Sequence, residues 1–127
     1  MVLIDTHILF WFLNGDDRVG PGSRKFIERS APVYFSAMSI LELGIKGQKD
    51  LRLRPLEIYE TAKNQGFEEL PLEVSGLHGV IEKPLFPRHD PFDQALISQA
   101  QAHRLDFLTA DQKLLSLGLD FVVDATR

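Results

Sequence analysis

Short apolar runs that alternate with helix-like segments constrain the fold of this chain more than any other feature of its sequence. The runs are rich in leucine, aromatic and β-branched side chains, which suits strands buried on both faces. They lie at Val2–Ile4, Val33–Phe35, Leu70–Leu72, Phe107–Thr109 and Phe121–Val123. Strands that alternate with helices indicate a parallel sheet covered on both sides. We therefore predict an α/β fold with three layers, α/β/α, around a mainly parallel central sheet.

The segments between these runs carry the start and stop signals of helices, such as proline in a first turn and glycine after a last one. The predicted helices span Thr6–Leu13, Pro21–Arg29, Leu56–Asn64, Val74–Glu82, Asp90–Arg104 and Asp111–Leu117. Another helix is predicted to open at Ser39, because Ser39 and Glu42 have the Ser-x-x-Glu form of a capping box. A chain of 127 residues with 44% hydrophobic side chains is typical of one compact unit, so we expect residues 1–127 to form a single domain.

Cysteine and long apolar segments are both missing from the sequence. The lack of cysteine excludes a disulfide scaffold, a thiolate zinc site and a cysteine nucleophile, and it fits a reducing compartment. The longest uninterrupted apolar run, Ile8–Leu13, falls far short of the roughly 20 residues that cross a bilayer. We therefore expect a soluble, cytoplasmic protein that makes no use of a membrane.

The charge balance argues against binding nucleic acid through a broad basic face. Lys and Arg number 14 and Asp and Glu number 18, which gives a net charge of −4. A nucleic-acid substrate would have to be held by local basic groups and by bound cations.

Acidic residues recur where the predicted strands lead into helices. In parallel α/β sheets, ligands bind beyond the carboxyl ends of the strands. The acids that can converge there are Asp5, Glu42, Asp93 and Asp111. Carboxylates packed together oppose one another's ionisation unless a divalent cation offsets the repulsion. Oxygen ligands without cysteine favour Mg²⁺ or Mn²⁺.

Each acid also has an ordinary structural interpretation. Asp5, Asp90 and Asp111 can be helix caps, and Glu42 can belong to the capping box with Ser39. A shared cation explains all the acids at once, which is why we prefer it.

With these acids in place, the chain resembles the PIN-domain ribonucleases, most closely the VapC-type toxins of bacterial and archaeal toxin–antitoxin pairs. The matching segments are Leu3–His7, Ser36–Leu43 followed by Lys46, His89–Ile97 and Leu108–Asp111. Each motif is weak alone, but together they span nearly the whole chain in the family's order and spacing.

The resemblance implies a five-stranded parallel sheet between helices and an endoribonuclease that depends on Mg²⁺ or Mn²⁺. It assigns the catalytic, metal-binding quartet to Asp5, Glu42, Asp93 and Asp111, with Asp90 close enough to assist. It also implies an RNA substrate, a cognate antitoxin protein and a homodimer. Many members carry one aspartate where this chain has Asp90 and Asp93; we favour Asp93 as the ligand, because Asp90 is better placed to cap a helix.

Four residues near the acids are candidates for contact with substrate: Thr6, Lys46, Arg88 and His89. Each has a second interpretation. Thr6 can orient a carboxylate, Lys46 can pair with an acid, and the loop with Arg88 and His89 can be simply solvated. The run Phe10–Phe12, with Trp11 at its centre, is predicted to lie in the core, or in part against a partner chain.

Two other functions compete with the nuclease. An aspartate-nucleophile phosphohydrolase typically has a second aspartate two residues after the first, but position 7 is histidine. A non-catalytic PIN-like module that binds Mg²⁺ or a partner is the other alternative. The presence of all four acids disfavours a degenerate site.

Overall fold

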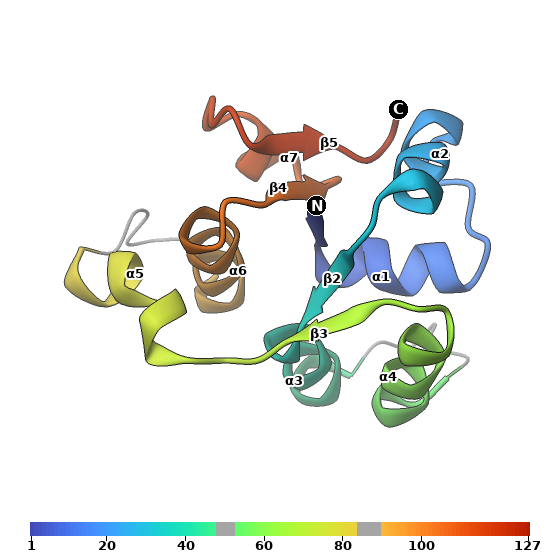
Figure 1. Ribbon diagram of the computed structural model, residues 1–127, viewed down its shortest axis with the longest axis horizontal. Helices are drawn as coiled ribbons and strands as arrows, with labels where there is room; N and C mark the ends of the chain where they lie inside the picture. The colour runs from blue at the N-terminus through green and yellow to red at the C-terminus, as the bar shows by residue number, and fades with distance from the viewer. Residues whose placement is uncertain (48–52, 84–89) are drawn as a thin grey trace.

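Five strands form one sheet, and every neighbouring pair runs parallel (Figure 1). The computed structural model describes residues 1–47, 53–83 and 90–127. The strands are β1 (Val2–Ile4), β2 (Val33–Ser36), β3 (Glu68–Leu70), β4 (Asp106–Thr109) and β5 (Val122–Asp124), in the order β3-β2-β1-β4-β5. The predicted α/β fold with a mainly parallel five-stranded sheet is confirmed.

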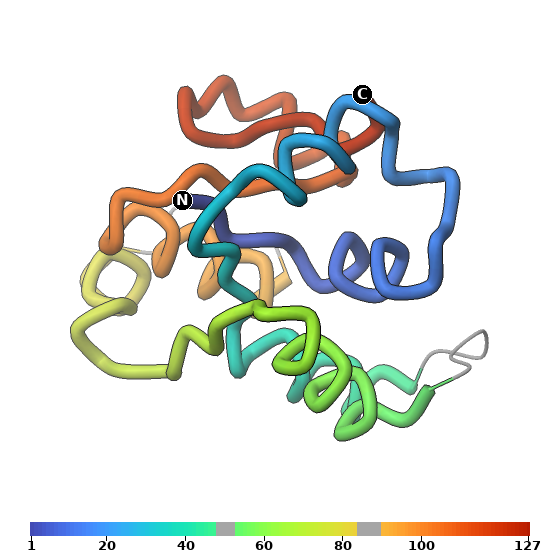
Figure 2. Tube along the Cα trace, turned by 45° about the vertical axis from the view of Figure 1, so that its right-hand side comes forward, coloured from blue at the N-terminus to red at the C-terminus, as the bar shows by residue number. Residues whose placement is uncertain are grey.

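Helices cover both faces of this sheet. They are α1 (Thr6–Leu13), α2 (Pro21–Arg29), α3 (Ala37–Lys46), α4 (Pro55–Asn64), the 3₁₀ turn η1 (Val74–Gly76), α5 (His78–Glu82), α6 (Pro91–Ala102) and α7 (Gln112–Leu115). Both views place α3 and α4 side by side near the β2–β3 edge (Figures 1 and 2). No helix within the three described ranges is long and apolar enough to cross a membrane.

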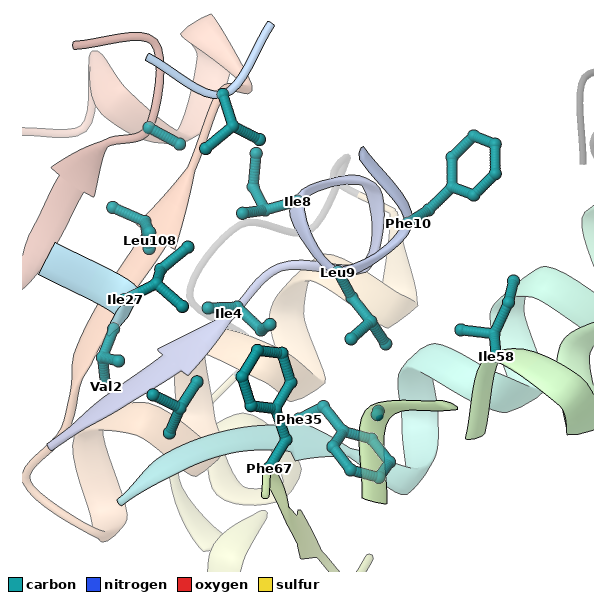
Figure 3. Close-up of a cluster of buried hydrophobic side chains, with 14 of the residues drawn as sticks. Val2, Ile4, Ile8, Leu9, Phe10, Ile27, Phe35, Ile58, Phe67 and Leu108 are labelled. Carbon is teal, nitrogen blue, oxygen red and sulfur yellow. The ribbon is translucent and has the colours of Figure 1, made fainter. Parts of the chain in front are cut away.

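The central strand β1 feeds both hydrophobic layers, because successive side chains of a strand point to opposite faces. Val2 and Ile4 pack with α1, α2 and α4, whereas Leu3 packs with α6 and α7. All three side chains are fully buried. Figure 3 shows Ile8 and Leu9 of α1 pointing toward the sheet. This packing fixes α1 and α6 on opposite faces, with their first turns at the same edge.

The capping box predicted at Ser39 is wrong. Helix α3 begins two residues earlier, because Ser36 at the end of β2 accepts a hydrogen bond from the Met38 amide at 3.0 Å. Ser36 is fully buried, so this cap forms where strand and helix meet rather than at an exposed turn. Ser39 and Glu42 therefore lie inside the helix, where their side chains are available for other contacts.

Two other predicted elements are displaced. The strand expected at Leu70–Leu72 occupies Glu68–Leu70, since pairing with β2 at the sheet edge holds even the poorly strand-forming glutamates in place. The helix expected over Val74–Glu82 is broken at Leu77, and the Gly76 carbonyl accepts a hydrogen bond from Ser98 of α6 at 2.9 Å.

Candidate active site

A cavity of about 660 Å³ lies at the carboxyl edge of the sheet, where β1, β2 and β4 lead into helices. Its lining residues are Asp5, His7, Trp11, Glu42, Lys46, Asp90, Asp93, Ala110, Asp111 and Lys113. We call it the acid cavity. All four predicted acids line it, together with Asp90 and Lys46.

Asp5 leaves the end of β1 and caps α1. One carboxylate oxygen accepts a hydrogen bond from the Thr6 amide at 2.7 Å, and the other accepts one from the Thr109 hydroxyl at 2.6 Å. The Thr109 hydroxyl in turn accepts one from the Asp111 amide at 3.1 Å. Burial raises the pKa of Asp5 above its usual range, even though these hydrogen bonds act to lower it. Thr109 thus links the first and fourth acids across adjacent strands.

Glu42 reaches the cavity from the second turn of α3 and is almost completely buried. Its Oε1 lies 2.6 Å from the hydroxyl of Thr6, which also lies 2.9 Å from the hydroxyl of Ser39. A carboxylate can only accept, so Thr6 donates its proton to Glu42. Thr6 itself is 1% exposed and does not line the cavity. Its position suits the orientation of Glu42 rather than contact with substrate.

Lys46 bridges two acids from different helices. Its Nζ lies 2.7 Å from Glu42 Oε2 and 2.6 Å from Asp90 Oδ2. Partial burial acts to lower the pKa of Lys46, but hydrogen bonds to the two carboxylates raise it above its usual range. Burial likewise acts to raise the pKa of Asp90, but the bond with Lys46 lowers it. Asp90 also caps α6 through the Phe92 amide at 2.8 Å, as predicted.

Burial and the grouping of acids shift the pKa of Asp93. Asp93 stands in the first turn of α6, and its pKa is raised to about 7, first by burial and then by repulsion from the neighbouring acids. Those acids are Asp5, Asp90, Glu42 and Asp111. All five carboxylates line the same cavity, which brings like charges close together.

Asp111 caps the short helix α7 through the Lys113 amide at 2.8 Å. Asp5, Asp90 and Asp111 are therefore all helix caps and also line the cavity. A capping role therefore does not keep these carboxylates out of the cavity.

The family model of the PIN domain matches residues 2–118. The chain belongs to the PIN-domain family. Among solved structures, the crystal structure of VapBC2 from Rickettsia felis bound to a DNA fragment from their promoter contains a chain of similar fold. The TM-score is 0.59 at 14% sequence identity, over 98% of this chain and 97% of that chain. No curated protein matches the sequence.

Sequence reasoning missed four lining residues of this PIN domain: His7, Trp11, Ala110 and Lys113. Trp11 packs against the core as expected, but it is only partly buried and also lines the cavity. The sequence does contain a signal for two of them. His7 and Trp11 stand four residues apart in the helix that follows Asp5, so they share the helical face beside that acid. Arg88 and His89, two predicted substrate contacts, lie outside the described residues.

The carboxylate oxygens of the acid cavity are suitable ligands for a hard divalent cation, but their side chains are not arranged to hold one as they stand. Within the described ranges, no three Asp, Glu, His or Cys side chains are placed to hold a metal ion as they stand. Lys46 engages Glu42 and Asp90, and Thr109 engages Asp5. Carboxylate oxygens are nevertheless the ligands that Mg²⁺ and Mn²⁺ prefer. Five carboxylates line the cavity against Lys46 and Lys113, so negative charge is in excess there.

Proposed function

We propose that this PIN domain is a metal-dependent endoribonuclease that hydrolyses RNA phosphodiester bonds, and that it acts as the toxin of a toxin–antitoxin pair. The observation that carries the proposal is the convergence of acids from β1, α3, α6 and the start of α7 in one cavity. Membership of the PIN family supports the nuclease class.

Asp5, Glu42, Asp93 and Asp111 would hold Mg²⁺ or Mn²⁺, with Asp90 assisting. When bound, the cation would supply the positive charge that activates water and offsets charge developing on the phosphodiester. The chain's own contribution is to place the carboxylates. Thr109 orients Asp5, Thr6 orients Glu42, and Lys46 holds Glu42 against Asp90. Contact of Lys46, Arg88 and His89 with RNA remains part of the proposal.

The proposed biological setting is a cytoplasmic complex with a cognate antitoxin, with the toxin as a homodimer. The likeness in fold to a chain of VapBC2 supports an antitoxin partner. Co-expression with the neighbouring open reading frame should relieve growth arrest caused by the chain alone. Arrest that persists with Asp5→Asn would count against RNA cleavage as its cause.

A PIN-like module that binds Mg²⁺ or a partner without cleaving RNA is the second candidate. One observation favours it: Lys46 forms ion pairs with two of the acids, Glu42 and Asp90, and so offsets part of their charge. Such a module would bind RNA or a partner protein and leave a broad panel of RNAs intact.

The decisive assay uses purified protein and end-labelled RNAs of varied sequence, with Mg²⁺, with Mn²⁺ and with EDTA. We expect internal cleavage with either metal, none with EDTA, and a loss of about a hundredfold or more in rate for Asp5→Asn, since it removes a buried ligand. The Asp106→Asn variant, at the exposed start of β4, is the matched control and should cleave normally. Cleavage that survives EDTA would refute the metal mechanism.

A further inference from the structure

The outer face of α1 presents two rings beside the acids. His7 and Trp11 stand one helical turn apart, with ring centroids 5.8 Å apart and planes inclined by 50°. Both line the acid cavity, whereas Ile8 and Leu9 between them are fully buried in the core. The same helix thus fixes the rings against the sheet and turns them toward the cavity.

Arg18 extends this surface from the turn after α1. Its guanidinium lies 4.2 Å from the centroid of the Trp11 ring, in cation–π geometry. Asp16 holds it there through Nε at 3.1 Å and Nη2 at 2.6 Å. The Arg18 side chain is 59% exposed, so solvent still reaches it. We call His7, Trp11 and Arg18 the aromatic–cationic wall.

The negative charge of the cavity opposes the binding of RNA. Five carboxylates line the cavity against the two ammonium groups of Lys46 and Lys113, so an RNA phosphate is repelled until a cation binds. Affinity for RNA must therefore come in part from groups beside the acids. Aromatic faces and an arginine provide it without reading sequence, since every base has a π-face.

We infer that the aromatic–cationic wall binds an unpaired nucleobase of single-stranded RNA, stacked on Trp11 and Arg18, and thereby delivers the adjoining phosphate to the acids. The inference rests on the proposed ribonuclease function and adds the residues that would hold a nucleotide beside the acids. Bases in a duplex keep their faces stacked on one another and cannot use this surface. Two members of the wall, His7 and Trp11, line the same cavity as the acids, and Arg18 lies against the Trp11 ring, which favours a nucleotide over a protein partner as the occupant.

The test uses the fact that Trp11 is the chain's only tryptophan. Its fluorescence is titrated in the Asp93→Asn background with Mg²⁺, and gels verify that the RNA stays intact. The ligands are a single strand of about 12 nucleotides, the same strand annealed to its complement, and inorganic tripolyphosphate. We expect saturable quenching by the single strand and little by the duplex or by tripolyphosphate.

Affinity is measured separately by anisotropy of the labelled single strand. Trp11→Leu and Arg18→Met should each weaken binding by about tenfold, whereas Trp11→Phe, which keeps a stacking face, should stay within about threefold. Phe12→Leu is the matched control, because the neighbouring Phe12 packs against Phe67 and does not line the cavity. All variants should unfold cooperatively and bind Mn²⁺ as the background protein does.

Equal RNA affinity of Trp11→Leu and Phe12→Leu would overturn the inference, as would equal quenching by the duplex. Loss of dimer or antitoxin binding in Trp11→Leu with unchanged RNA affinity would make the wall a protein interface and also overturn it. Failure of the proposed function looks different: the wild-type protein would leave RNA intact while the single strand still quenched Trp11.

Discussion

Replacing Asp93 by asparagine is expected to abolish RNA cleavage and, in the same molecule, to raise the thermal stability of the metal-free protein above pH 7. The side chain keeps its size but loses the charge that burial and four neighbouring acids oppose. Loss of a proposed metal ligand should lower the cleavage rate by about a hundredfold or more. A gain in stability with a loss of function is typical of a strained active site.

The pH dependence follows from the direction of the shift. The pKa of Asp93 is raised from 3.8 to about 7, so between these values the folded protein retains a proton that the unfolded chain has lost. Stability therefore falls as the pH rises through this window and stays reduced above it. Since Asp93 is partly exposed and screened by solvent, the deficit should be about 1 to 2 kcal/mol, or roughly 5 °C in Tm.

Thermal unfolding in EDTA at pH 5 and pH 8 measures this effect. From pH 5 to pH 8, the Tm of the wild-type protein should fall further than the Tm of Asp93→Asn. Added Mg²⁺ at pH 8 should raise the Tm of the wild-type protein more than it raises the Tm of the variant. Asp90→Asn is the matched control. It should lower stability at pH 8, because it removes the partner of Lys46. If Asp93→Asn were less stable than the wild-type protein at pH 8 in EDTA, the repulsion argument would be wrong.

The second large effect is expected from Lys46→Met, which should tighten Mn²⁺ binding by about tenfold while lowering the stability of the metal-free protein. The Lys46 ammonium contacts Glu42 and Asp90 at 2.7 and 2.6 Å, so a divalent cation must compete with it for these carboxylates. Its removal leaves more negative charge in the cavity, which attracts the metal and repels the acids from one another. Methionine keeps much of the apolar stem.

Calorimetric titration with Mn²⁺ and thermal unfolding in EDTA check the two halves of this prediction. Lys113→Met is the matched control, because Lys113 lines the same cavity yet forms no ion pair with the acids in the described part of the chain. Its affinity for Mn²⁺ should change by less than about threefold. Weaker Mn²⁺ binding by Lys46→Met would mean that the ammonium assists the metal instead of competing with it.

Much of the fold could be predicted because local and tertiary signals agree. Helix α1 begins and ends where the sequence places it, since Asp5 caps it and Asn14-Gly15 follow its last turn. The convergence of the acids was also predictable, because parallel strands bring their carboxyl ends to one edge. These inferences need only the order of the elements.

The errors occur where a distant contact outweighs a local pattern. Ser36 caps α3 from the end of a buried strand, and Gln99 of α6 hydrogen-bonds that same hydroxyl, a contact between residues 63 apart in sequence. The expectation that Lys46 can pair with an acid is confirmed, but its pair with Asp90 spans 44 residues and the sequence does not name that partner. Contacts between residues so far apart in the sequence leave no local pattern. The sequence alone therefore favours Ser39 as the cap of this helix, because Ser39 has the capping-box pattern. Trp11 packs against the core as expected, but an apolar run does not reveal that the same ring also lines the cavity.

Calorimetric titration of the metal-free wild-type protein with Mn²⁺, alongside Asp5→Asn, tests most directly whether the gathered carboxylates form a cation site. We predict saturable binding by the wild-type protein, with protons released at pH 6.5 because Asp93 is then largely protonated. Binding by Asp5→Asn should be at least about tenfold weaker. No detectable binding by the wild-type protein, or equal binding by both, would contradict the account.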